Sequence, residues 1–105
     1  MTNHAAVLTA LADPTRRAIF ERLARSPSAV GDLARELPVT RPAVSQHLKV
    51  LKSAGLVTDQ AAGTRRVYSV DPAGVAVIRD YFEQFWQHSL ARFRAAASQP
   101  IQEET

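Results

Sequence analysis

Side chains that could bind nucleic acid share one face of a helix predicted to begin near residue 40. This face carries Thr40, Arg41, Pro42, Ser45, Gln46, Lys49 and Lys52, with His47 at its margin. Ser45 and Gln46 suit hydrogen bonds to base edges, and Arg41 suits guanine or a phosphate. Lys49 and Lys52 suit phosphates as point charges. The face therefore indicates contact with DNA, and the competing interpretation is an ordinary solvated helix surface.

A second cationic segment has the sequence AAGTRR, at residues 61–66. Short apolar segments flank it on both sides, which predicts a β-hairpin with Gly63 in its turn. Thr64, Arg65 and Arg66 would then lie near the hairpin tip, beside the minor groove or the backbone of DNA. The alternative is that the two arginines are only solvated on an exposed hairpin.

Apolar spacing and helix-breaking residues predict the elements that position these side chains. We expect helices over about 3–11, 14–25, 40–54 and 73–97, a short helix before Pro38, and strands over 56–60 and 65–70. Asp13-Pro14 and Asp71-Pro72 are typical helix starts, with Asp as the N-cap. The sequence SPS at 26–28 should interrupt the chain and cap the short helix. Gly55 should end the helix before it in the left-handed conformation.

The fold class follows from this order of elements, α-α-α-α-β-β-α. The residues expected to face inward are Ile19, Phe20, Leu23, Val30, Leu33, Leu37, Val44, Leu48 and Leu51. Two helices joined by Pro38-Val39-Thr40 and followed by a hairpin are typical of a winged helix-turn-helix, which is mainly α with a small β-hairpin wing. We expect one DNA-binding and dimerisation domain over residues 1–97 and a polar tail over 98–105.

Three segments carry a resemblance to a known family. In this order and spacing, ADPTRRAIFERL, RPAVSQHLKVLKSAGLV and GTRRVYSVDP resemble the ArsR family of bacterial winged-helix repressors. The resemblance covers about residues 5–95. It implies a homodimer, paired through its first and last helices, that binds an inverted repeat in double-stranded DNA. Such a protein represses by blocking access to a promoter, often its own.

The sensing sites of that family do not carry over to this sequence. Many members bind arsenic, lead or cadmium through a Cys-Val-Cys pattern, but Ala29 and Gly31 stand at those positions, and the chain contains no cysteine. A second family site binds zinc on the terminal helix. Asp80, Glu83 and His88 occur there, but the paired histidines are absent. We therefore expect no metal and no cofactor, and the identity of any small-molecule effector stays open.

The predicted terminal helix carries an apolar stripe too long for this small domain to cover. A two-fold partner would bury both copies of the stripe at once. The predicted dimer interface consists of Val7, Leu8, Leu11, Phe82, Phe85, Trp86, Leu90 and Phe93. A small-ligand pocket beneath the aromatic residues is the alternative, and the two interpretations are compatible.

Charge and composition limit the remaining functional classes. Residues 40–70 hold five basic residues and one acid, whereas the rest of the chain holds eight and nine, so positive charge is concentrated where DNA would bind. No apolar run is long enough for a membrane span, and no signal peptide is evident, so we expect a cytoplasmic protein. No grouping suggests an enzyme. Alternatives to a dimeric repressor are a protein-interaction winged helix and a repressor released by an inducer or by zinc.

Overall fold

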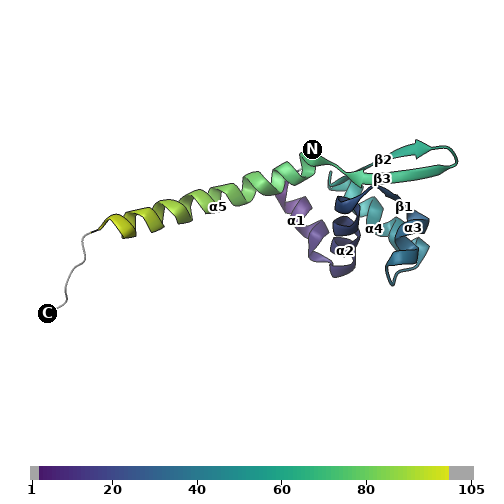
Figure 1. Ribbon diagram of the computed structural model, residues 1–105, viewed down its shortest axis with the longest axis horizontal. Coiled ribbons are helices and arrows are strands. Elements are labelled where there is room, and N and C mark those ends of the chain that lie inside the picture. The colour runs from purple at the N-terminus through teal and green to yellow at the C-terminus, as the bar shows by residue number, and fades with distance from the viewer. Residues whose placement is uncertain (1–2, 100–105) are drawn as a thin grey trace.

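The computed structural model describes residues 3–99, and its elements are labelled in Figure 1. They are α1 (His4–Ala12), α2 (Pro14–Arg25), β1 (Ser28–Ala29), α3 (Val30–Glu36), α4 (Arg41–Ser53), β2 (Val57–Ala62), β3 (Arg65–Val70) and α5 (Pro72–Ser98). The mainly helical winged fold is as predicted. Of the expected polar tail, residues 100–105 lie outside the described part of the chain.

Side-chain caps explain where the helices begin. The carboxylate of Asp13 accepts a hydrogen bond from the amide of Arg16 at 2.8 Å, which starts α2. Asp71 accepts from the amide of Ala73 at 3.0 Å and starts α5. The hydroxyl of Thr40 accepts from the amide of Ala43 at 3.3 Å at the start of α4. Each bond satisfies an amide that has no partner within the helix, and these three predicted starts are confirmed.

The expectation that residues 26–28 cap α3 is wrong. Ala29 is the N-cap residue and makes no side-chain capping bond. Ser28 and Ala29 instead form β1, which pairs antiparallel with β3 at Tyr68 and Val67. The sheet therefore has three strands in the order β1-β3-β2. In this order β1 covers an edge of β3 that would otherwise carry unpaired backbone groups.

The hairpin extends further than its apolar pattern suggested. In β2 and β3 the register runs from Val57 opposite Val70 to Ala62 opposite Arg65, so β2 continues through the small residues before the turn. Gly63 occupies the turn with φ of 65°, which glycine adopts without strain. The hairpin projects from the body of the molecule as a wing (Figure 1).

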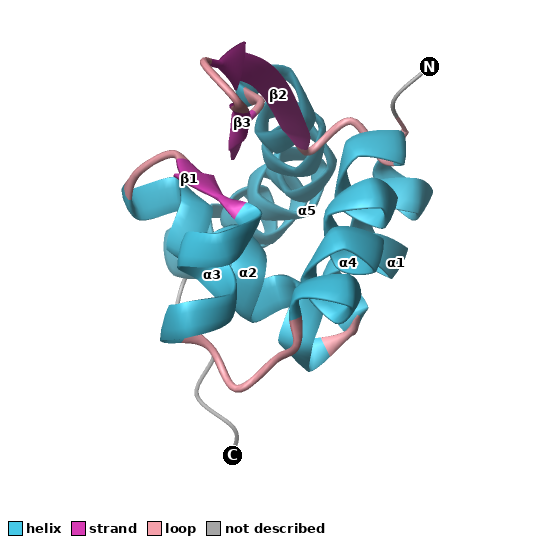
Figure 2. Ribbon diagram, turned by 90° about the vertical axis from the view of Figure 1, so that its right-hand side faces the viewer, coloured by secondary structure: helices cyan, strands magenta, loops and turns pink. Residues whose placement is uncertain are grey.

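The core lies where α1, α2, α3 and α4 meet beneath the sheet. Figure 2 shows α3 and α4 side by side, with the hairpin above them. The buried residues that fill the core are Val7, Ala10, Ile19, Leu23, Leu33, Val44, Leu48, Leu51, Ala54, Leu56 and Val57. The inner face predicted for α4 is thus confirmed, and Phe20, Val30 and Leu37 pack against this core while partly exposed.

Helix α5 leaves the body and gives the molecule its elongated shape, about 74 × 28 × 21 Å. Its first turns contact α1, and the remainder extends away from the domain (Figure 1). At its start, Gly74 is buried against the backbone of Gly55, which ends α4 with φ of 80°. This close approach joins the end of α4 to the base of α5.

Candidate nucleic-acid interface

Helix α4 separates its residues into a buried and an exposed side. Val44, Leu48 and Leu51 have no exposed surface, which fixes the rotation of the helix about its axis. The exposed residues on the opposite side are Thr40, Arg41, Pro42, Ser45, Gln46, Lys49 and Lys52. Apolar packing therefore presents a hydrogen-bonding and cationic surface of the size that enters a major groove.

The end of α4 is tied to the wing by a carboxylate that is almost fully buried. The side chain of Asp59 in β2 is 7% exposed and lies 2.7 Å from the ammonium of Lys52 and 2.6 Å from Nε of Arg66. Lys52 first, and Arg66 second, lower the pKa of this carboxyl below its ordinary value. The two cations remain more than half exposed, so they can still face a phosphate, but their charge is partly neutralised.

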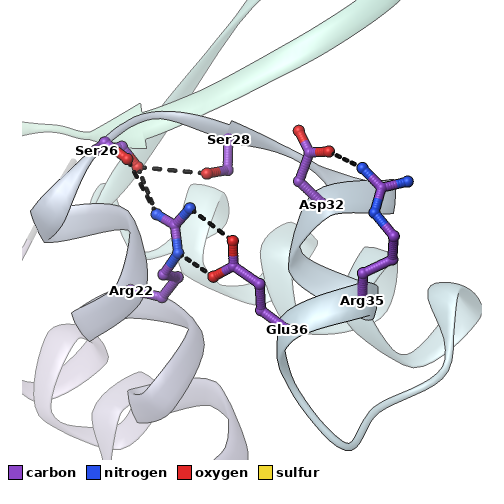
Figure 3. Close-up of polar contacts among 6 residues, drawn as sticks. All are labelled: Arg22, Ser26, Ser28, Asp32, Arg35 and Glu36. Atoms are coloured by element: carbon purple, nitrogen blue, oxygen red, sulfur yellow. Dashed lines mark hydrogen bonds and ion pairs between the residues drawn. The ribbon is translucent and has the colours of Figure 1, made fainter.

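A second carboxylate ties α3 to the wing. Asp32 accepts a hydrogen bond from Nη2 of Arg65 at 2.5 Å. It also pairs with Arg35, and Figure 3 shows this second contact. The bond from Arg65 is the main cause that lowers the pKa of Asp32. Both arginines are well exposed. The wing is therefore fixed by one carboxylate from β2 and another from α3.

Among the described residues, Arg41 and Lys49 have no carboxylate partner within ion-pair distance. The other three cations of residues 40–70, which are Lys52, Arg65 and Arg66, each have one. The count of charges in residues 40–70 therefore overstates the free positive charge. Asp32 lies outside these residues, but it pairs with Arg65 inside them. Arg41 folds back over α3. A Cβ added to Gly31 would lie 2.6 Å from Nη2 of Arg41.

His47 differs from its neighbours on α4. It is half-buried, and it lies close enough to Asp13 to contribute to the lowered pKa of that carboxyl, whose main cause is the hydrogen bond from the amide of Arg16. This position favours a role in the contact between α2 and α4.

The angle between α2 and α3 is held by one arginine that the sequence patterns did not single out. Arg22 forms a two-pronged ion pair with Glu36, one prong of which joins Nη2 to Oε1 at 3.1 Å (Figure 3). Its Nη1 also donates to the carbonyl oxygen and hydroxyl of Ser26, each at 3.1 Å. This pairing lowers the pKa of Glu36 and raises that of Arg22. Arg22 joins α2 to Glu36 at the end of α3, and α3 leads directly into α4. Arg22 therefore helps to position the α3–α4 pair.

The aromatic stripe of α5 is exposed in the single chain. Phe82, Phe85, Trp86 and Phe93 have between 49% and 71% of their surface exposed, and Leu90 is half-buried. At the base of the stripe, His4 of α1 stacks on Tyr81 with ring centroids 4.1 Å apart. Tyr81 also makes edge contacts with Phe82 and Phe85. The stripe therefore follows one helix, and within residues 3–99 no other element covers its exposed rings.

The α1 residues expected beside this stripe differ in exposure. Leu8 and Leu11 are half-buried, and Leu11 packs on the core. Val7 has no exposed surface and belongs to the core of its own chain, which argues against a direct contact with a partner. The spacing along α1 could not separate the two roles, since Val7, Leu8 and Leu11 fall on neighbouring positions of one short helix.

Two further structural findings concern metals and membranes. Within residues 3–99, no group of three or more His, Cys, Asp or Glu side chains is arranged to hold a metal ion, and this includes Asp80, Glu83 and His88. No helix in the same residues is both long and apolar enough to cross a bilayer.

The fold and the exposed face of α4 define the class as a winged helix-turn-helix regulator. The family described as a helix-turn-helix domain matches residues 11–60. The HTH-type transcriptional regulator Rv2034 of Mycobacterium tuberculosis is 64% identical over 84 residues, which are 80% of this chain and 78% of that protein.

Two solved structures extend the comparison to almost the whole chain. An ArsR-like transcriptional regulator from Rhodococcus sp. RHA1 has a TM-score of 0.74 and 31% identity, covering 91% of this chain and 93% of the other. The winged helix-turn-helix DNA-binding domain of Mb0332 from Mycobacterium bovis, described as homodimeric and as a possible ArsR-family regulator, has a TM-score of 0.63 and 30% identity, covering 96% and 85%. The chain belongs to the ArsR family of transcriptional regulators.

Proposed function

We propose that the protein is a homodimeric repressor that acts in the cytoplasm and binds an inverted repeat in double-stranded DNA. One observation carries this proposal: the exposed face of α4 presents Ser45 and Gln46, while the opposite face is locked into the core. Short and planar hydrogen-bonding groups on a fixed helix can distinguish base edges in the major groove. Bound across a promoter, such a dimer represses by occlusion.

The uncovered stripe on α5 supports pairing of two copies. Exposed Phe82 and Trp86 would be buried against the same residues of a second chain in a two-fold contact. The homodimeric description of Mb0332, a protein similar along most of its length, favours the same assembly. Two-fold symmetry would place two α4 helices in successive major grooves, about 34 Å apart.

The proposed contacts divide into two groups. Ser45 and Gln46 would read bases, Arg41 would reach guanine or a phosphate, and Thr40 and the lysines would bind phosphates. On the wing, Thr64, Arg65 and Arg66 would follow the backbone or the minor groove. His47 would support α4 rather than read a base, since it lies near Asp13.

The test begins with selection of bound fragments from genomic DNA and footprinting of the selected site. Replacing Gln46 with Ala should lower affinity for that operator about tenfold or more, and affinity for random DNA much less. Gln84→Ala, the same change on exposed α5, is the control. Equal losses on both DNAs would exclude Gln46 from base readout.

The symmetry of the complex has its own test. Inserting about half a helical turn between the two half-sites would place them on opposite faces of the duplex, which a rigid dimer cannot reach. Affinity should then fall to that for a single half-site, and a full-turn insertion is the matched control. Unchanged affinity after the half-turn insertion would contradict a symmetric dimer on an inverted repeat.

A further inference from the structure

A cavity of about 460 Å³ opens where α3, the start of α4 and the wing meet. Its lining consists of Ala29, Val30, Gly31, Arg35, Arg41, Arg65, Arg66 and Tyr68. Four of these eight residues are arginines, and they come from three separate elements of the fold. Such convergence of guanidinium groups on one cavity is unusual for a solvated surface and suits an anion with several acceptor oxygens.

The charges around this cavity are not balanced. Two carboxylates serve three of the four arginines: Asp32 pairs with Arg35 and Arg65, and Asp59 pairs with Arg66. Asp59 also holds Lys52. Arg41 has no ion-pair partner among residues 3–99. The arginine-lined cavity therefore has an excess of positive charge even with both acids ionised.

Gly31 explains how Arg41 reaches the cavity. The guanidinium lies directly over this glycine, within 2.6 Å of where a Cβ would stand, so any larger residue would displace it. The lack of a side chain thus lets α4 contribute a cation above the surface of α3. Ala29, Val30 and Tyr68 complete the lining.

From these contacts we propose that the cavity is a phosphate-binding site. Guanidinium groups bind phosphate oxygens through paired hydrogen bonds, and the excess charge matches a phosphate group. On binding, Arg35 and Arg65 would exchange Asp32 for phosphate oxygens while Arg41 closes from the α4 side. The phosphate can belong to the DNA backbone or to a small phosphorylated molecule, and only the first source rests on the proposed function.

The direct test uses inorganic phosphate and the full chain without DNA. Under mildly alkaline conditions phosphate is mainly a dianion. Phosphate is titrated at constant ionic strength, balanced with chloride, and binding is followed through the shifts of the backbone amide signals of Val30 and Gly31. We expect saturable shifts with phosphate and none with chloride. Arg35→Ala, at an exposed side chain, should weaken binding about tenfold. Arg92→Ala, the same charge change far along α5, should not.

Gly31→Ala gives an independent variant that changes no charge. The added methyl group meets only the flexible end of Arg41, so the fold should persist while that guanidinium is displaced and phosphate binding weakens. Phosphate shifts that equal those of chloride, or that persist unchanged in Arg35→Ala and Gly31→Ala, would overturn the proposal. Neither outcome depends on whether the protein represses transcription.

Measurements of DNA binding distinguish the two sources of the phosphate. If a backbone phosphate occupies the cavity, Arg35→Ala should weaken operator binding and reduce the log–log salt slope by about one, whereas Arg92→Ala should not. If a free phosphorylated molecule occupies it, added phosphate should release the parent protein from DNA, whereas Arg35→Ala should bind DNA like the parent protein and stay bound when phosphate is added. Either result supports the site and assigns its ligand.

Discussion

The carboxylate of Asp59 lies 2.7 Å from the ammonium of Lys52, and it joins the last turn of α4 to the first strand of the wing. The same carboxylate accepts a hydrogen bond from Arg66 at 2.6 Å. This acid therefore sets the position of the wing relative to α4 and also reduces the positive charge that both offer to DNA.

Replacing Asp59 with Asn should strengthen binding to DNA of any sequence. The change releases Lys52 and Arg66, which are 55% and 58% exposed, so two cations become available to phosphates. We expect several-fold higher affinity for random DNA, because neither Lys52 nor Arg66 has to give up an acid before it binds a phosphate. Binding titrations on random DNA at one fixed salt concentration measure the affinity. Asp80→Asn, the same change at the exposed Arg79–Asp80 pair, is the control, and equal gains in both variants would refute the role of Asp59.

Much of the fold could be predicted because its signals are local. Asp13 and Asp71 precede prolines and cap the helices that follow, and these bonds span only two or three residues. The inner face of α4 could likewise be read from its period, since Val44 and Leu48 are four positions apart and fully buried. Strand β1 could not be predicted, because two residues carry no alternation and its partner β3 is about forty residues away.

The candidate site could be predicted in part, for a related reason. The exposed residues of α4 follow from the helical period, but the partners of the wing arginines depend on tertiary contacts. Arg65 pairs with Asp32, thirty-three positions earlier, and no local pattern joins them. The closeness of Gly31 and Arg41 is also a tertiary contact, so the arginine-lined cavity is visible only in the folded chain.

Stability should fall in acid because four carboxyl groups are held ionised. The pKa values of Asp13, Asp32 and Asp59 lie below the ordinary 3.8, and that of Glu36 lies below 4.5. The unfolded chain therefore binds these protons first, so their stabilisation is complete above the unfolded values and is lost as pH falls through the folded ones. Urea unfolding at a series of pH values should show a decline beginning at about pH 5.

The double variant Asp32→Asn, Asp59→Asn identifies the source of this decline. Its free energy of unfolding should be lower near neutral pH and should fall less steeply in acid than that of the parent protein. Asp80→Asn should keep the parent's profile. A parallel decline in the double variant and the parent would show that these ion pairs do not cause the acid sensitivity.

Gly74→Ala should destabilise the fold. A Cβ at this position would clash with the carbonyl oxygen of Gly55, and a backbone carbonyl cannot swing aside as a flexible side chain can, so α5 must shift away from the end of α4. Overpacking of this kind costs about 1–3 kcal/mol, measurable by urea unfolding. Gly31→Ala is the matched control, because its Cβ meets only a flexible arginine end. Equal stability of the two variants would contradict tight packing at Gly74.

Replacing Phe82 and Trp86 with Ser should convert the proposed dimer to a monomer. Both rings are more than half exposed in the single chain, so the protomer should stay folded. Losing two aromatic contacts from each copy should raise the dimer dissociation constant by roughly a hundredfold or more. Sedimentation velocity at several concentrations measures the change. The control is Gln84→Ser with Gln87→Ser, which changes polar positions on the same helix. An unchanged dimer in the aromatic variant would exclude this stripe from the interface.

Replacing Arg65 and Arg66 with Ala should reduce the salt dependence of DNA binding. Each arginine is paired with an acid in the free protein, and on DNA it would exchange that acid for a phosphate. The log–log slope should therefore become shallower by about one to two, with similar loss of affinity for operator and random DNA. Arg79→Ala with Arg92→Ala removes the same charge from α5 and should leave the slope unchanged. If the slopes of both double variants match that of the parent, the wing does not contact phosphates, and α4 must bind DNA without it.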